Sequence, residues 1–285
     1  MAADGNTAPI LAHIDLLAVF GDSFSDTNNT HCLSGGKAPD PDFNYQGRSS
    51  NGPLWVDYVA ERLSKPVRNY AYCGATSDNT LVRGTYDLER QHTVPCGREQ
   101  TAKYIAEPRN TDRVLHVIEL GNNEYLNQLY PDVEITEELQ GKIVNSIVET
   151  MDTLRVQTGG RYFLIFALAS LHRTPLVTAM SAETVAAFED AVCLHNRLLM
   201  KRVSAYATAY PDITMRVFNL SEHMIQMLDH QLPHDMTNTT IACFDEVQST
   251  VYSDQDSYYF WDSVHLTTKA NRHVADAVIK VLRTF

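Results

Sequence analysis

Five short apolar runs, separated by helix-like segments, constrain the fold of this chain more than any other feature. They are rich in valine, leucine, isoleucine and phenylalanine, and they cover residues 16–20, 67–72, 114–120, 161–168 and 213–220. Short runs that are apolar throughout are typical of strands buried on both faces, and such strands form parallel sheets. The sequence therefore predicts an α/β fold with a five-stranded parallel sheet between two layers of helices.

Some of the segments between these runs show helical periodicity, and others do not. Apolar residues share one face of a helix predicted after Pro53, and longer helices are predicted over about 136–156, 182–210 and 267–282. A short helix to about residue 230 follows the fifth run. Three polar stretches without helical period are predicted as loops, the second with short helical turns: 28–51, 77–112 and 231–261. Loops of this length in a compact domain are usually functional.

Length and charge exclude several classes of protein. The 285 residues fit a single domain, 1–285, with 1–15 as a loosely ordered lead-in, because no linker or repeat divides the chain. The net charge of −12 argues against nucleic acid as a partner, because phosphates would repel it. No apolar run approaches the roughly 20 residues of a membrane-spanning helix, so no such helix is expected.

The cysteines and the N-terminus leave alternatives open. No two of the five cysteines stand at metal-ligand spacing, so we expect no metal site. One or two disulfides with a leftover thiol, or five free thiols, fit equally well. Polar residues such as Asp4 and Asp15 interrupt any signal-peptide core, so the chain is either intracellular or a secreted protein without its signal peptide.

Polar residues follow three of the apolar runs. Ser23 comes after the first run, Gly74 after the second and Asn123 after the third. The carboxyl ends of parallel strands share one edge of a sheet, and ligands bind there, so we expect these residues to meet at one site. A serine at a strand end can combine a nucleophilic oxygen with an anion-stabilising N–H.

A nucleophilic serine needs a base, and the base needs an orienting carboxylate. Asp262 and His265 stand three residues apart before the last predicted helix, where a single turn can bring both side chains together. A tetrahedral oxyanion needs hydrogen-bond donors. The candidates are the N–H groups of Ser23 and Gly74 and the side-chain amide of Asn123, with the neighbouring Asn122 as a competitor for the amide role.

Four sequence blocks together resemble the GDSL esterase/lipase family of the SGNH hydrolase superfamily. In chain order they read Phe-Gly-Asp-Ser-Phe-Ser-Asp at 20–26, Asn-Tyr-Ala-Tyr-Cys-Gly-Ala at 69–75, Gly-Asn-Asn-Glu at 121–124 and Asp-Ser-Val-His at 262–265. Their order is the family's, and they span almost the whole chain. The segments 51–55 and 260–262 further resemble the plant and fungal secreted branch, which includes carbohydrate acetylesterases.

The resemblance implies a flavodoxin-like three-layer α/β/α fold and ester hydrolysis without a metal or other cofactor. It implies a catalytic triad of Ser23, His265 and Asp262, an oxyanion hole of Ser23, Gly74 and Asn123, and secretion, with a cytoplasmic location as the alternative. Two residues depart from the family pattern. Phe24 replaces a leucine, which packing should absorb, and Glu124 replaces an aspartate, so its extra methylene is expected to affect the position of Asn123.

The predicted function is that of a serine esterase acting on short-acyl, chiefly acetyl, esters of carbohydrates or related small molecules. The alternative is a lipase, phospholipase or acyltransferase that takes longer acyl chains. Aromatic residues of the predicted loops suit stacking on sugars, contact with acyl chains or plain internal packing: Phe43, Tyr45, Tyr258 and Tyr259. A non-catalytic binding protein on the same fold is the third hypothesis.

Overall fold

A parallel sheet of five strands forms the centre of the molecule in the computed structural model, which describes residues 11–87, 89–108, 111–130, 133–231 and 233–285. The strand order is β2-β1-β3-β4-β5. The strands are β1 (Leu16–Gly21), β2 (Val67–Asn69), β3 (Val114–Glu119), β4 (Tyr162–Ala167) and β5 (Thr214–Asn219). The predicted α/β fold is confirmed. Residues 1–10 of the expected lead-in lie outside the described residues, and Leu11–His13 form a 3₁₀ turn.

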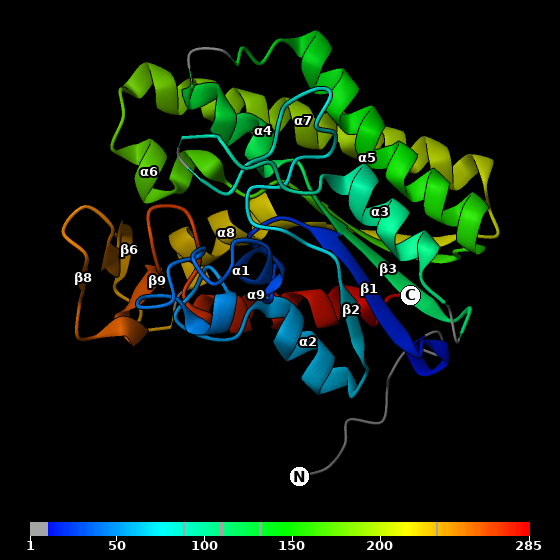
Figure 1. Ribbon diagram of the computed structural model, residues 1–285, viewed down its shortest axis with the longest axis horizontal. Coiled ribbons are helices and arrows are strands. Elements are labelled where there is room, and N and C mark those ends of the chain that lie inside the picture. Colours follow the sequence, from blue (N-terminus) through cyan, green and yellow to red (C-terminus); the bar gives the residue numbers. More distant parts are fainter. Residues whose placement is uncertain (1–10, 88, 109–110, 131–132, 232) are drawn as a thin grey trace.

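Helices cover both faces of the sheet, as Figure 1 shows. The helices α3 (Gly97–Ala106), α5 (Glu137–Thr158) and α7 (Ala182–Ala209) lie over one face. The other face carries α2 (Trp55–Leu63) and α9 (Thr268–Leu282), which pack against each other, and α8 (Leu220–Gln226), which contacts α9. The fold therefore has the three layers expected from the sequence.

Alternate residues of the central strand enter two separate cores. Leu17 and Val19 of β1 belong to the core beneath α2 and α9, whereas Ala18 and Phe20 belong to the core beneath α3 and α5. Both faces of the strand are fully buried. This double burial explains why the sequence of β1 is continuously apolar instead of alternating.

The strand order reverses between β1 and β3, and the chain forms its functional loops at this point. In doubly wound sheets such a reversal opens a crevice beyond the carboxyl ends of the strands. The short helix α1 (Asn29–Leu33) follows the loop after β1, and α4 (Asn122–Leu126) follows β3. Another short helix, α6 (Pro175–Thr178), follows β4. Segments that follow different strands thus gather at one edge.

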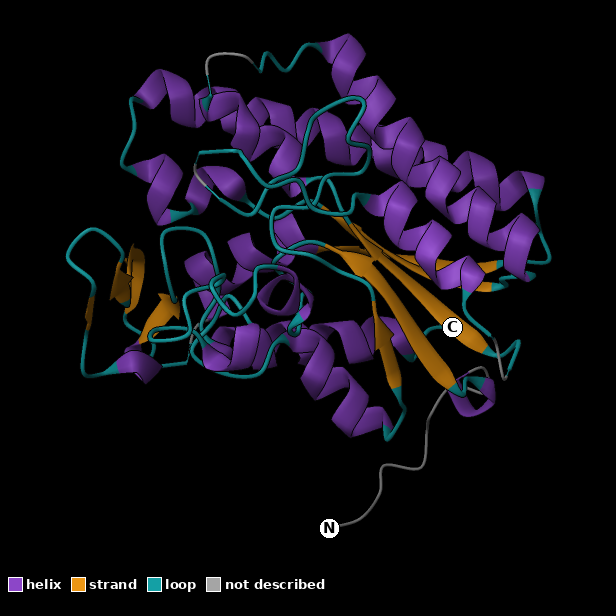
Figure 2. Ribbon diagram, viewed as in Figure 1, coloured by secondary structure: helices purple, strands orange, loops and turns teal. Residues whose placement is uncertain are grey.

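The structure differs from the sequence-based prediction in four places, the first of which is the helix α1 inside the predicted loop over 28–51. The second strand ends at Asn69 instead of residue 72, although the N–H groups of Tyr70 and Tyr72 still donate to the carbonyls of Val19 (2.8 Å) and Gly21 (3.2 Å) on β1. The predicted loop over 77–112 contains the full helix α3. The predicted loop over 231–261 contains four short strands, which Figure 2 shows apart from the main sheet.

These four strands form what we call the small-sheet lobe, residues 238–260. Parallel strands β6 (Asn238–Ala242) and β9 (Tyr258–Phe260) form one two-stranded sheet. The antiparallel hairpin of β7 (Phe244–Asp245) and β8 (Thr250–Val251) forms the other. Pairs this short carry little pattern in sequence, which is why polar composition alone suggested a loop.

Two remaining expectations concern cysteines and membrane helices. All five cysteines lie within the described ranges and are free thiols. Among the described residues, no helix combines the length and apolar character that crossing a bilayer requires.

Candidate active site

The turn after β1 presents Ser23 at the edge of the sheet. The N–H groups of Ser25 and Asp26 donate to the carbonyl of Asp22, at 3.1 and 2.9 Å, so the chain reverses directly after the strand. Glycine is required at position 21, because a Cβ there would lie 2.9 Å from the carbonyl oxygen of Glu119 on the adjacent strand. The turn therefore follows the strand without a spacer and projects from its carboxyl end.

His265 bridges the Ser23 hydroxyl and the Asp262 carboxylate. Its Nε2 lies 2.7 Å from Ser23 Oγ, and its Nδ1 lies 2.7 Å from Asp262 Oδ2. The second oxygen of Asp262 accepts the backbone N–H groups of Val264 (2.8 Å) and His265 (2.6 Å). This turn fixes the carboxylate against one ring nitrogen and leaves the other facing the hydroxyl. Residues 242 positions apart in sequence thus meet with hydrogen-bonding geometry.

The environment of this pair favours the charged forms of both side chains. Burial lowers the pKa of His265, but the charge and hydrogen bond of Asp262 outweigh burial, so the pKa lies above its usual value. Burial raises the pKa of Asp262, but the His265 charge and the hydrogen bonds to the carboxylate leave it below its usual value. A histidine of raised pKa is a stronger base once it is neutral.

The three predicted oxyanion donors lie on three neighbouring segments. Gly74 adopts a φ of +77°, and a Cβ there would lie 1.9 Å from the carbonyl oxygen of Thr85, so the backbone approach requires glycine. The Asn123 amide donates one hydrogen bond to the carbonyl of Ala75 at 2.9 Å, which ties it to the Gly74 loop. Within the described ranges, the N–H groups of Ser23 and Gly74 donate to no protein atom.

Asn122, the competing amide, is committed elsewhere. It is 2% exposed. Its Nδ2 donates to Asp22 Oδ2 (3.1 Å) and Glu119 Oε1 (2.9 Å), and its Oδ1 accepts the N–H of Ala169 (3.0 Å). An amide with both donors engaged cannot also bind an oxyanion, so the geometry favours Asn123 for that position.

The two departures from the family pattern are both accommodated by burial. Phe24 is buried, and its ring centroid lies 5.5 Å from that of His265. Glu124 is fully buried, and its Oε1 accepts the N–H of Ser77 at 2.7 Å. Burial raises the pKa of Glu124 to about 7. The longer side chain therefore reaches the backbone of the loop that follows Gly74 instead of solvent.

Comparison with known proteins identifies the family of this chain. The model of GDSL-like lipases and acylhydrolases matches residues 17–278, which is most of the chain. The protein belongs to the GDSL lipase/acylhydrolase family. The family expected from the four sequence blocks is confirmed.

Individual GDSL relatives are distant. The chain is 22% identical to the thermolabile hemolysin of Vibrio parahaemolyticus, covering 94% of this chain and 63% of that protein. It is 23% identical to the phosphatidylcholine-sterol acyltransferase of Aeromonas hydrophila, covering 80% of this chain and 65% of that protein. An acetyl-xylooligosaccharide esterase of Geobacillus stearothermophilus shares the fold, with a TM-score of 0.50, 13% identity and 94% of each chain covered.

Two side chains that support the site of this GDSL enzyme were missed in the sequence. The amide of Gln100 in α3 pairs with both backbone groups of Gly21, at 2.9 Å each. Glu119 at the end of β3 contacts the Ser23 turn from the other side, through Ser25. A carboxylate inside a mostly apolar strand was the available signal for Glu119, whereas the polar stretch containing Gln100 offered none.

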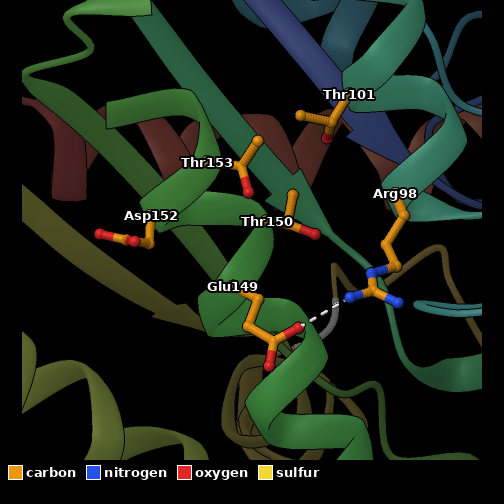
Figure 3. Close-up of a pocket in the computed structure, with 6 residues that line it drawn as sticks. All are labelled: Arg98, Thr101, Glu149, Thr150, Asp152 and Thr153. Atoms are coloured by element: carbon orange, nitrogen blue, oxygen red, sulfur yellow. Dashed lines mark hydrogen bonds and ion pairs between the residues drawn. The ribbon is translucent and has the colours of Figure 1, made fainter. Parts of the chain in front are cut away.

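The structure also contains a pocket outside the candidate site and a groove that reaches the Asp262–His265 turn. A pocket of about 340 Å³ between α3 and α5 is lined by threonines and the Arg98–Glu149 ion pair, as Figure 3 shows, and contains no residue of the candidate site. A larger groove of about 690 Å³ lies between α6 and the small-sheet lobe and reaches Ser263, inside the Asp262–His265 turn. No group of three His, Cys, Asp or Glu side chains among the described residues could hold a metal ion.

Proposed function

We propose that this GDSL enzyme hydrolyses carboxylic esters through an acyl-enzyme formed on Ser23. The observation that carries the proposal is the continuous chain of two 2.7 Å hydrogen bonds from the Ser23 hydroxyl through the His265 ring to Asp262. A serine becomes nucleophilic when an adjacent base can remove its proton, and this chain supplies both the base and the group that orients it.

In the proposed reaction, His265 Nε2 takes up a proton and gives it back, once in acylation and once in deacylation. Ser23 Oγ attacks the ester carbonyl while its proton passes to Nε2, and Asp262 stabilises the imidazolium. The N–H groups of Ser23 and Gly74 and the Asn123 amide stabilise the oxyanion. The intermediate expels the alcohol, which takes the proton from Nε2. Water then gives a proton to Nε2 and attacks the acyl-enzyme, and the second intermediate releases the acid as the proton on Nε2 returns to Ser23 Oγ.

Covalent labelling of Ser23 tests this proposal directly. A fluorophosphonate should add to the protein once, and peptide mass spectrometry should place the label on Ser23. Ser23→Ala should lose labelling and reduce kcat on a nitrophenyl ester by about 10⁴-fold or more. Ser204→Ala, at an exposed serine of α7, is the matched control and should behave like the wild type. Labelling at another serine, or none, would favour the non-catalytic hypothesis.

The small-sheet lobe favours lipid esters over acetylated sugars as substrates. Its apolar side chains Ile241, Val247 and Tyr252 are 50%, 95% and 45% exposed, and all three line the groove beside Ser263. Exposed apolar groups gathered in this way mark contact surfaces. Relatives named as a hemolysin and as a phosphatidylcholine-sterol acyltransferase support the same choice.

The four aromatic loop residues, which suit sugar stacking, acyl contact or internal packing, mostly pack internally and so give little support to a sugar substrate. Phe43 stacks on Phe244 with a centroid distance of 4.4 Å, and Tyr258 and Tyr259 are buried. Only Tyr45 of the four is exposed. Three of the four rings thus contribute to packing, and the buried Tyr258 and Tyr259 are closed to a ligand.

A series of nitrophenyl esters from acetyl to palmitoyl, together with acetylated xylo-oligosaccharides, separates the two substrate classes. Lipid specificity predicts a kcat/KM that rises with chain length, by about tenfold for each two methylenes held in an apolar groove. A maximum at acetyl, with release of acetate from the sugar, would instead support the carbohydrate esterase. An added alcohol that captures the acyl group would identify the transferase.

A further inference from the structure

A buried polar network joins the ends of β1 and β3 directly behind the candidate site. Its members are Asp22, Ser25, Glu119 and Asn122, each at most 2% exposed. Glu119 Oε2 accepts the Ser25 hydroxyl at 2.9 Å and the Asp22 N–H at 3.4 Å. Glu119 Oε1 accepts Asn122 Nδ2 at 2.9 Å, and the same nitrogen donates to Asp22 Oδ2 at 3.1 Å. Glu119 is therefore the common partner of the network.

The network connects the two residues that precede the reacting groups. Asp22 stands immediately before Ser23, and Asn122 stands immediately before Asn123 in α4. We propose that Glu119 is a positioning residue that fixes the turn carrying Ser23 relative to the helix carrying Asn123. The inference rests on the proposed function, because it concerns the distance between its nucleophile and one of its oxyanion donors. An error of about 1 Å in such a distance is costly to catalysis.

The second feature of the network is a pair of adjacent buried carboxyl groups, Asp22 and Glu119. Burial, and then the Asp22 charge, raise the pKa of Glu119 well above its usual value. Burial raises the pKa of Asp22 to about 6. The charged group that faces the pair from the last loop is His265, whose attraction favours ionised Asp22. Burial and the neighbouring carboxylate thus favour the protonated form of Glu119.

Glutamine is the informative replacement because it keeps the shape of the Glu119 side chain without its ionisable group. Glu119→Gln keeps one oxygen that can accept from Ser25 and Asp22, while its amide nitrogen replaces Oε1, so Asn122 Nδ2 keeps only Asp22 Oδ2 as an acceptor. Glu119→Ala removes every contact, so the Ser25 hydroxyl also loses its acceptor. The two variants separate the hydrogen bonds of Glu119 from its charge.

Steady-state kinetics on a nitrophenyl ester that the wild type hydrolyses tests the positioning role. Glu119→Gln should keep kcat within about tenfold of the wild type, whereas Glu119→Ala should lose about 100-fold or more in kcat with KM changed less than about threefold. Asn122→Ala should show a similar loss, and the double variant should lose far less than the product of the two single losses. Glu149→Gln, an exposed carboxylate on α5, is the control and should match the wild type.

The pH profile supplies a measurement that simple loosening of the fold would not change. The acid limb of kcat/KM reports the pKa of His265 in the free enzyme. Because a positioning residue acts through its hydrogen bonds and not through charge, the limb should stay within about 0.3 pH units of its wild-type position in Glu119→Gln. A shift to lower pH by a full unit would show that Glu119 acts on His265 through its charge and would overturn the inference.

Two other results would also overturn it: a Glu119→Ala enzyme with wild-type kcat, or a Glu119→Gln enzyme as impaired as the alanine variant. If Glu119→Ala does not fold by circular dichroism, the activity and pH profile of Glu119→Gln decide alone. Failure of the proposed function itself is recognised separately, because Ser23→Ala would then retain wild-type turnover whatever the Glu119 variants do.

Discussion

The edge of the sheet at Ser23 and the small-sheet lobe are built in opposite ways. At the edge, the polar side chains of Asp22, Glu119 and Asn122 are buried and bonded to one another. In the lobe, the apolar side chains of Ile241 and Val247 face solvent. A buried, bonded network fixes distances, whereas an exposed apolar surface offers contact area to a partner. The comparison suggests that the edge determines rate and that the lobe determines which ester is favoured.

The largest expected effect tests the edge through Asp262. Replacing Asp262 with asparagine should reduce kcat by about 10³–10⁴-fold, because the amide cannot stabilise the imidazolium and allows the wrong tautomer. The Asp262 carboxylate raises the pKa of His265, and His265 must be neutral to accept the Ser23 proton. The acid limb of kcat/KM should therefore lie above pH 6.5 in the wild type and move to lower pH in the variant.

The control for this change is Asp276→Asn, which removes an exposed carboxylate paired with Arg62 on the outer side of α9. It should leave the rate and the acid limb where they are. An Asp262→Asn enzyme whose acid limb stays in place would mean that Asp262 does not set the basicity of His265.

A smaller loss is expected at the predicted oxyanion donor Asn123. Asn123→Ala should reduce kcat by about 10²–10³-fold with little change in KM, because the donor acts on charge that develops only in the transition state. The exposed Asn145→Ala on α5 is the matched control. A change confined to KM would assign Asn123 to substrate binding instead.

The sequence predicted the edge well because its signals are local. Five apolar runs predicted five strands, and glycine with a polar residue after a strand marked the positions of Ser23, Gly74 and Asn123. Parallel strands bring their carboxyl ends together, so the gathering of these segments followed from topology alone. The roles of the three residues and of the Asp262–His265 pair stay predictions until the variants are measured.

The sequence predicted the lobe and the supporting network poorly because their partners are distant in the chain. The strand β6 pairs with β9 across some twenty residues, and β7 pairs with β8 over two residues each, so no periodic pattern develops. Gln100 and Glu119 bond backbone or side-chain groups 79 and 94 residues away. Only folding reveals that a glutamine in a polar stretch supports a turn after the first strand.

The buried carboxyl of Glu124 allows the stability of the sheet edge at Ser23 to be tested separately from catalysis. The pKa of this buried carboxyl is raised to about 7, so the folded state binds its proton more tightly than the unfolded chain does. Its contribution to stability is complete below about pH 4.5 and is lost as pH rises through 7. Since one pKa unit corresponds to about 1.4 kcal/mol, ionising Glu124 costs ~3 kcal/mol of unfolding free energy by pH 9.

Glu124→Gln should remove this pH dependence. Between pH 4.5 and 9 the free energy of unfolding, measured with urea, should fall less steeply in the variant than in the wild type by up to ~3 kcal/mol. Glu138→Gln, at an exposed position in the first turn of α5, serves as the control. Parallel pH curves for wild type and Glu124→Gln would show that Glu124 ionises as freely in the fold as in the unfolded chain.

The smallest expected effect tests the lobe at Val247, the most exposed large apolar side chain of the described residues. Val247→Ser should change stability by less than about 0.5 kcal/mol, because the side chain contacts little in the fold. Activity on a soluble short-chain ester should stay at the wild-type level, whereas activity on a long-chain ester in neutral lipid vesicles should fall several-fold, about what one lost apolar contact costs. Neutral vesicles are the appropriate surface because no lysine or arginine stands between Arg216 and Lys269 to attract anionic lipid.

Val156→Ser on α5 is the matched control, since that valine is 57% exposed but lies far from the groove in sequence and on another element. If both serine variants lose vesicle activity equally, the effect comes from general surface polarity and the lobe has no special part in it. If only Val247→Ser loses it, and the soluble ester is unaffected, the exposed lobe contributes to lipid contact while the buried edge carries the chemistry. An equal loss on both substrates for Val247→Ser would mean instead that the lobe supports the site itself, and the division between the two regions would fail.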